Sequence, residues 1–217
     1  SIMVETGAAS RCIAVTSSHF CSAERQFRFP LEYGGQRTPT AQWTVTGSGA
    51  AVVGNSGDSP FVSAVTIGRI MDLGIKDANN MGAAMAPAAV STITDFLKDT
   101  GTKPDDYDLI LTGDLGEVGS TLLYELLERD GISLKNKHAD CGLLIYDKES
   151  QDVHAGGSGC SASVLCSYIM SRLKQGELNN ILFVATGALM SPTSSQQGES
   201  IPGVAHLVQL KSSASAG

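Results

Sequence analysis

Residues 108–146 read DLILTGDLGEVGSTLLYELLERDGISLKNKHADCGLLIY and alternate short apolar runs with an amphipathic segment. The runs at 108–112 and 142–146 have the length of buried strands, whereas apolar residues recur at helical spacing through 118–129. The alternation continues toward the C-terminus, with a helix expected at 161–173 and strands at 180–185 and 204–210. Strands that alternate with helices predict an α/β fold.

The preceding part of the chain is rich in strand-forming residues. Residues 12–18 (CIAVTSS) predict a buried strand that ends beside His19. The β-rich segments 43–53 and 61–72 are separated by the turn residues GNSGD at 54–58, which predicts a hairpin.

A long helix is predicted between these strands and residue 108. Apolar residues recur at helical spacing from Met81 to Leu97. Asn80 is a good helix N-cap, and Gly101 is a good stop signal.

The composition argues against several classes of protein. The 217 residues are 42% hydrophobic and 17% charged, which is enough apolar material for a sizeable core. The net charge is −7 and the 15 Lys and Arg residues are scattered, so no nucleic-acid surface is expected. No stretch approaches the ~20 apolar residues that span a bilayer. The five cysteines form no CxxC motif, which favours free thiols in a reducing compartment.

A glycine-containing loop, Thr112–Gly116, follows the strand predicted at 108–112. Its flexible backbone at Gly113 could point amide groups at an anion near the start of the next helix. A tight turn in which Asp114 caps that helix accounts for the same residues.

The densest group of polar residues lies in the Gly-rich segment 152–161, DVHAGGSGCS. His154 could act as an acid, a base or an anion donor, and Ser158 and Cys160 could donate hydrogen bonds. The amides from Gly157 to Cys160 could form an anion nest. The alternative is that these glycines serve close packing. A third Gly-containing loop, 185–192, leads into the polar residues 193–203, which could cover a pocket or cross the surface.

Common catalytic and metal-binding motifs are missing from the sequence. GxGxxG after a first strand, GxxxxGK[ST], HExxH and GxSxG do not occur. The histidines are too dispersed to predict a metal site. We expect His206 to be structural and His138 to lie in a surface loop.

Five long stretches of the chain follow the pattern of one protein family. They are TSSHFCSAERQFRFPLEYGGQRTPTAQWTVTGSGAAVV, DLGIKDANNMGAAMAPAA, LILTGDLG, HAGGSGCSAS and ATGALMSPTSSQQGESIPGVAH. On these stretches the chain resembles the stage V sporulation protein AD family, thiolase-fold proteins of endospore-forming bacteria. The resemblance implies a thiolase-like layered fold, with mixed sheets and helices between and outside them.

The resemblance also predicts how the chain is divided. It places residue 1 within the helix that follows the nucleophile loop, so the first third of the domain is expected to precede it. Residues 1–72 would be the remainder of the first thiolase-like half, and residues 73–217 the second half.

The resemblance implies a non-catalytic protein. The nucleophilic Cys of thiolase relatives has no counterpart here. Gly113, Asp114, Leu115 and Gly116 stand where synthase III-like enzymes carry a His-Gln-Ala-Asn loop. Where thiolases carry a His-Pro-x-Gly loop and the synthases an Asn-Thr-Ser loop, this chain has residues 154–159 (HAGGSG), so the resemblance implies that the imidazole of His154 is retained, at a spacing that differs by one residue. A second catalytic Cys is replaced by the segment 188–191 (ALMS).

What the family implies is binding of dipicolinic acid, pyridine-2,6-dicarboxylate, and support of its uptake into the developing spore. We expect no cofactor and no bound metal other than calcium carried by the ligand as its chelate. The alternatives are a thiolase- or ketoacyl synthase III-like acyl-transferring enzyme with its nucleophile upstream of this chain, and a scaffold with a vestigial cavity. The ligand-binding residues that we predict are His154, Gly157, Ser158, Cys160, Gly113, Asp114, His19 and Asn80.

The expected partners, besides dipicolinic acid, are other membrane proteins of the stage V sporulation A group and a second copy of the chain as a homodimer. The expected location is peripheral, at the inner membrane of the forespore and spore.

Overall fold

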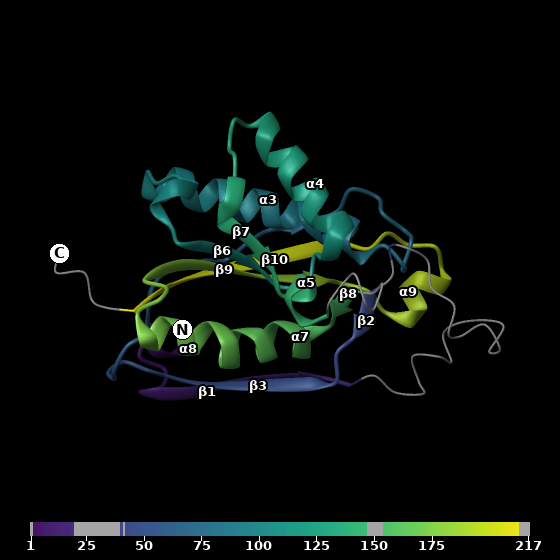
Figure 1. Cartoon of the computed structure of the whole chain (residues 1–217). Helices are drawn as coiled ribbons and strands as arrows, with labels where there is room; N and C mark the ends of the chain where they lie inside the picture. The colour runs from purple at the N-terminus through teal and green to yellow at the C-terminus, as the bar shows by residue number, and fades with distance from the viewer. Residues whose placement is uncertain (1, 20–39, 41, 147–153, 213–217) are drawn as a thin grey trace.

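The computed structural model describes residues 2–19, 40, 42–146 and 154–212, stacked in layers around a six-stranded sheet (Figure 1). The strand order is β4 (Phe61–Thr66), β10 (Gly203–Lys211), β9 (Asn180–Ala188), β6 (Leu109–Thr112) and β7 (His138–Asp140), and β5 (Ile70–Met71) also pairs with β10. β6 is parallel to β7 and β9, whereas β10 is antiparallel to β9 and β4. The carboxyl ends of β6, β7 and β9 therefore meet at one edge of the sheet, where α/β folds place their ligands.

The helices α3 (Met81–Thr100) and α4 (Gly116–Arg129) cover one face of this sheet (Figure 1). The side chain of Asn80 accepts a hydrogen bond from the Ala83 amide at 3.3 Å, and Gly101 ends α3 with a φ of 64°. The predicted helix and both of its end signals are confirmed. The core beneath it contains Ile93, Phe96, Leu123, Leu127, Val184 and Leu207.

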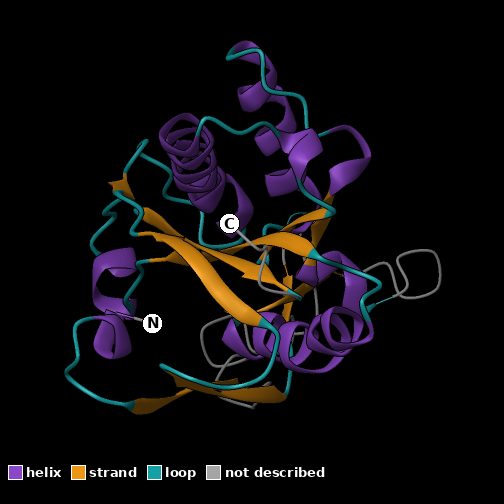
Figure 2. Cartoon of the chain, turned by 90° about the vertical axis from the view of Figure 1, so that its left-hand side faces the viewer, coloured by secondary structure: helices purple, strands orange, loops and turns teal. Residues whose placement is uncertain are grey.

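A second helical layer covers the opposite face. α7 (Ser158–Ser163), the π-helical turn η4 (Val164–Ile169) and α8 (Met170–Gln175) follow one another directly along the chain. They lie between the central sheet and an outer antiparallel pair, β1 (Arg11–Ser18) and β3 (Gly47–Gly54). Figure 2 shows helices on both faces of the central strands. The core on this side contains Leu111, Val164, Ile169, Leu173 and Phe183.

A short parallel pair, β2 (Gln42–Thr44) and β8 (His154–Gly156), brings Gln42 beside the Gly-rich segment. The remaining short elements are α1 (Ile2–Glu5), η2 (Pro104–Asp106), η3 (Lys135–Lys137), α5 (Cys141–Ile145) and α9 (Pro192–Gln196). None of the helices in the described ranges is long and apolar enough to cross a bilayer.

The prediction of a strand at 142–146 was wrong, because residues 141–145 form the helix α5. The side chain of Asp140 caps this helix by accepting the Gly142 amide at 3.0 Å. A short apolar run fits a buried strand and a buried helical turn equally well, so periodicity could not separate them. The α/β class itself is confirmed. The strand in this part of the chain is β7 (His138–Asp140), which lies directly before α5.

The predicted hairpin was also wrong. β3 pairs with β1, from Gly54 opposite Arg11 to Gly47 opposite Ser18, and β4 pairs with β10. The turn residues at 54–58 therefore carry the chain from one sheet to another.

The first strand was expected to be buried, but Ile13 and Val15 are each 67% exposed. Its strand pairing is satisfied by β3, while its outer side is not covered by described residues.

The division at residue 72 stays a prediction, and β4 and β5 on one side of it share a sheet with β10 on the other.

Candidate functional site

The Gly-containing loops predicted as functional meet at Asp114, which follows β6. One oxygen of its carboxylate accepts a hydrogen bond from the Gly157 amide at 2.8 Å, and the other accepts one from the Thr186 hydroxyl at 2.9 Å. The Asp114 amide donates back to the Thr186 oxygen at 3.1 Å. Residues 43 and 72 positions away from Asp114 in sequence thus form one cluster with it, which we call the three-loop junction: Gly113, Asp114, Gly157 and Thr186. Thr186 lies inside β9, because this strand extends to Ala188, into the segment 185–192 that was predicted as the third loop.

Close approach of these loops requires glycine. A Cβ atom on Gly113 would lie 2.6 Å from the Thr186 hydroxyl oxygen and 3.0 Å from that of Ser161. Gly157 has a φ of 89°, a left-handed conformation that side chains disfavour. The glycines at the junction therefore do allow close packing, which was the alternative interpretation of the Gly-rich segment.

The predicted anion nest in the Gly-rich segment makes hydrogen bonds within the protein. The Gly159 amide donates to the Ser18 hydroxyl oxygen at 2.9 Å, and the Cys160 amide donates to the Gly157 carbonyl at 3.0 Å. The exposed Ser158 hydroxyl donates to the Ser17 carbonyl at 3.0 Å. A ligand that used these groups would have to replace internal partners.

Asp140 is a buried carboxylate beside the junction that was not among the residues predicted from the sequence. Only 1% of its surface is exposed. Its carboxylate accepts hydrogen bonds from the Thr112 hydroxyl at 2.6 Å and from the amides of Leu115, Gly116 and Gly142 at 2.8, 3.1 and 3.0 Å. Burial raises the pKa of Asp140 to about 6, although the bonds from Thr112 and the amides oppose the shift.

The first amides of α4 are therefore held by Asp140, and Asp114 does not cap that helix. Gln42 supports the loop from the other side by donating to the Asp114 carbonyl at 2.6 Å. An Asp directly before an apolar run is a capping signal that could have pointed to Asp140.

His138 was expected in a surface loop, but it lies in β7 and is partly buried. Its Nε2 atom is 2.9 Å from the Thr112 hydroxyl oxygen and its Nδ1 atom is 2.7 Å from the Tyr124 hydroxyl oxygen. Burial lowers the pKa of His138 to about 4, so the ring is neutral at physiological pH. A continuous hydrogen-bonded chain therefore runs from Tyr124 through His138 and Thr112 to Asp140.

The cysteines near the junction, Cys141 and Cys160, are fully buried and free. Burial raises the pKa of both thiols, and the nearby carboxylates of Asp114 and Asp140 raise it further. A thiol nucleophile needs the opposite shift. Both groups are therefore protonated, and neither is prepared for acyl transfer.

The other predicted site residues are less closely connected to the junction. His154 lies in β8, opposite Gln42, and its side chain lies outside the described structure. His19 is exposed at the end of β1, and Asn80 caps α3. Among the described residues, neither His19 nor Asn80 hydrogen-bonds to Asp114, Gly157 or Thr186. His206 accepts the Gly68 amide at 3.1 Å, in agreement with a structural role.

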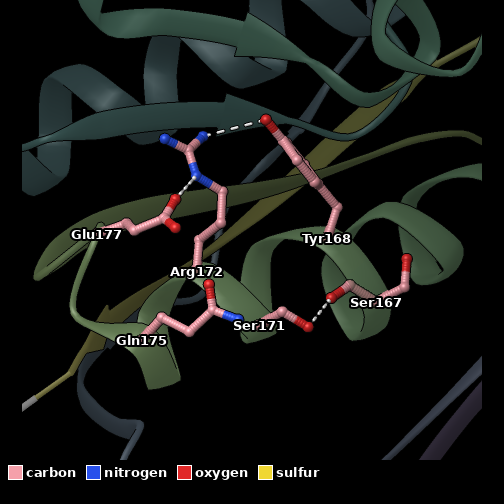
Figure 3. A pocket seen from close by; sticks show the side chains of 6 residues that line it. All are labelled: Ser167, Tyr168, Ser171, Arg172, Gln175 and Glu177. Atoms are coloured by element: carbon pink, nitrogen blue, oxygen red, sulfur yellow. Dashed lines mark hydrogen bonds and ion pairs between the residues drawn. The ribbon is translucent and has the colours of Figure 1, made fainter.

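The described part of the chain has shallow cavities away from the junction. One of about 570 Å³ lies over η4 and α8 and is lined by Ser167, Tyr168, Ser171, Arg172, Gln175 and Glu177 (Figure 3). There Arg172 pairs with Glu177 at 3.0 Å. Another, of about 420 Å³, lies near the ends of α3 and α4 and includes Thr94 and Lys98. No group of three metal-ligating side chains occurs among the described residues.

Comparison with known proteins connects this chain to one family. The family model for stage V sporulation protein AD matches residues 1–211. The stage V sporulation protein AD of Bacillus subtilis (strain 168) is 52% identical over 208 residues, which are 95% of this chain. The chain spans 61% of the length of that relative.

Solved structures share the fold at low sequence identity. They include 3-oxoacyl-[acyl-carrier-protein] synthase III from Aquifex aeolicus VF5, with a TM-score of 0.51, 15% identity and coverage of 97% of this chain and 60% of that one. The tetronic acid condensing enzyme AbyA1 has a TM-score of 0.56 at 16% identity, covering 97% and 62%. OleA from Xanthomonas campestris bound with cerulenin has a TM-score of 0.55 at 13% identity, covering 97% and 57%. The expected thiolase-like fold is confirmed, and these likenesses concern the fold alone.

Proposed function

Because the chain belongs to the stage V sporulation protein AD family, we propose that it binds dipicolinic acid without altering it chemically. In this role it supports uptake of the acid into the developing spore. The site is the three-loop junction, at the carboxyl ends of β6 and β9.

One observation carries the proposal: the junction already holds a carboxylate. The Asp114 side chain is bound there by an amide and a hydroxyl, at 2.8 and 2.9 Å. Uncharged donors that converge on one point suit a carboxylate of a planar diacid as well as they suit an aspartate. Ser158, exposed at the start of α7, is the nearby hydroxyl that we assign to the second ligand carboxylate.

The state of the thiols supports binding without catalysis. Cys141 and Cys160 are buried beside acidic groups, and their pKa values are raised. A thiolate would therefore form only at high pH, whereas acyl-accepting cysteines depend on a stabilised thiolate. The solved structures with this fold include condensing enzymes, so the enzymatic alternative needs its own test.

Delivery to the spore requires transfer of the ligand to a membrane pathway. We propose that the protein acts at the surface of the spore inner membrane, beside other stage V sporulation A proteins. The ligand enters alone or as its calcium chelate, whose cation would offset the net charge of −7.

Titration calorimetry of the intact protein with dipicolinate tests the proposal. We expect saturable heat with pyridine-2,6-dicarboxylate and none with pyridine-3,5-dicarboxylate, which keeps the charge but spreads the carboxylates. Absence of heat at saturating dipicolinate would overturn the proposal and leave the scaffold role. Incubation with an acyl-coenzyme A, followed by intact mass measurement, tests the enzyme: a covalent acyl adduct would overturn the non-catalytic assignment.

A further inference from the structure

The donors at the three-loop junction are occupied by the protein's own carboxylate. Asp114 takes the Gly157 amide and the Thr186 hydroxyl, which are the groups that a ligand carboxylate would use. The main chain of Asp114 is fixed separately, because its carbonyl accepts from Gln42 at 2.6 Å and its amide donates to Thr186 at 3.1 Å. The side chain can therefore leave its donors while the loop stays in place.

Asp114 differs in this respect from Asp140. Asp140 is 1% exposed and accepts hydrogen bonds from Thr112, Leu115, Gly116 and Gly142, so its removal would disrupt the start of α4. Asp114 is partly exposed, and within the described part of the chain its carboxylate accepts from the Gly157 amide and the Thr186 hydroxyl. Of these two carboxylates, Asp114 is the one that is not fully buried.

Electrostatic repulsion opposes the binding of a ligand carboxylate beside the ionised carboxylate of Asp114. Two like charges a few ångströms apart repel strongly where water is excluded. Burial raises the pKa of Asp114, and the bonds from Gly157 and Thr186 only partly offset that effect. A dicarboxylate beside it would raise the pKa further, so proton uptake by Asp114 would relieve the repulsion.

This inference rests on the proposed function: we propose that Asp114 is a displaceable internal occupant of the carboxylate site. The ligand enters by taking over the Gly157 amide and the Thr186 hydroxyl. Asp114 gives up both donors and takes one proton from solvent on a carboxylate oxygen. The empty protein thus keeps its donors satisfied, and a small monoanion that cannot displace Asp114 is excluded.

Other titratable groups face Asp114, and their charges affect how readily it takes up a proton. Asp140 approaches from the end of β7, Cys141 from α5 and Cys160 from α7. The two thiols are neutral at physiological pH, so Asp140 is the other negative charge among these groups. Because Asp140 is enclosed by its four donors, we expect the exchange of protons on binding to occur mainly at Asp114.

Calorimetry on the intact protein tests the displacement. Dipicolinate is titrated near neutral pH in two buffers that differ in ionisation enthalpy, and the difference in heat gives the number of protons taken up. We expect uptake approaching one proton for the unaltered protein and much less for Asp114→Asn. We also expect Asp114→Asn to bind at least ~10-fold more tightly, because a competing charge is lost.

Asp72→Asn is the matched control. Asp72 is an exposed carboxylate bound to Ser200 and the Gly74 amide, in the loop after β5. The substitution Asp72→Asn removes one negative charge, as Asp114→Asn does. We expect it to change neither the affinity for dipicolinate nor the number of protons taken up on binding.

The outcomes separate this inference from the proposed function. If no protein variant binds dipicolinate, the proposed function fails. If the unaltered protein binds without proton uptake, or if Asp114→Asn binds no more tightly than Asp72→Asn, the displacement is wrong while the binding function stands. The proton count of the unaltered protein decides the question even if Asp114→Asn does not fold.

Discussion

The Thr112 hydroxyl donates a hydrogen bond of 2.6 Å to the carboxylate of Asp140, linking the ends of the parallel strands β6 and β7. The same oxygen lies 2.9 Å from Nε2 of His138. Thr112 is fully buried, so its hydroxyl connects a partly buried imidazole to a buried carboxyl group.

We predict that Thr112→Val lowers the free energy of unfolding by about 1–3 kcal/mol, because the buried Asp140 and the partly buried His138 each lose a partner. Valine keeps the shape and removes only the hydroxyl. Thr16→Val, on the exposed strand β1, is the control and should change stability by less than about 0.5 kcal/mol. Urea unfolding of both variants measures the difference, and equal stabilities would contradict the role given to Thr112.

Asp140 and His138 should make opposite contributions to the dependence of stability on pH. The pKa of Asp140 is raised from 3.8 to about 6, so between these values the folded chain binds more protons than the unfolded chain. Its contribution to stability falls as pH rises through this window. The pKa of His138 is lowered from 6.5 to about 4, so its contribution rises with pH over nearly the same window.

Replacing either residue alone should therefore change the pH dependence of stability, and the two replacements should change it in opposite directions. We predict that, between pH 4 and 6, His138→Gln becomes less stable relative to the unaltered protein as pH rises, and Asp140→Asn becomes more stable. Each change across the window is roughly 2–3 kcal/mol, as expected for shifts of this size. Urea unfolding at several pH values provides the slopes. The double variant should follow the unaltered protein, and slopes of the same sign in both single variants would refute the assignment.

The parts of the fold that could be predicted from sequence are those with local signals. The helix at 81–100 was predictable because Asn80 and Gly101 mark its ends, and the loops at Gly113 and Gly157 because glycines follow apolar runs. Strand partners were not predictable, since the turn at 54–58 marks a reversal without specifying what β3 or β4 pairs with.

The contacts of the candidate site were beyond prediction for a similar reason. Asp114 meets Gly157 and Thr186 only because the central sheet brings loops 43 and 72 residues away to one edge. Asp140 was missed because it ends a strand of three residues, too short to show a period. The glycines could be identified, but whether their amides face a ligand or a neighbouring side chain depends on the packing.

The thiols offer a test of the non-catalytic assignment. We predict that, in the native protein, iodoacetamide modifies Cys12 and Cys166, which are partly exposed, well before Cys141 and Cys160. Cys141 and Cys160 are protected in two ways: burial keeps the reagent away from them, and their raised pKa leaves little of the reactive thiolate. Peptide mass mapping over time measures each site, with labelling in urea as the control for intrinsic reactivity. Fast labelling of Cys160 in native protein would argue for a reactive centre.

Ser158 and His154 remain predicted ligand contacts. We expect Ser158→Ala to weaken dipicolinate binding by about 0.5–1.5 kcal/mol, the contribution of one hydrogen bond, with little loss of stability. Its side chain is exposed and, among the described residues, donates to the Ser17 carbonyl, so folding depends little on it. Ser171→Ala, an exposed serine on α8 that donates to Ser167, is the matched control. We expect a loss of affinity also for His154→Ala, and unchanged affinity in both variants would remove the Gly-rich segment from the site.

The closeness of the loops at the junction can be tested with a single methyl group. A Cβ atom at position 113 would lie 2.6 Å from the Thr186 hydroxyl oxygen and 3.0 Å from its amide nitrogen, so Gly113→Ala must push the two loops apart. We predict a loss of about 1–3 kcal/mol in the free energy of unfolding, typical of overpacking, together with weaker dipicolinate binding. Gly187→Ala is the control in the neighbouring strand, because its new Cβ would meet Val204 at an ordinary 3.5 Å. If the two alanine variants are equally stable and bind equally well, the loops are not held at the distance on which the carboxylate site depends.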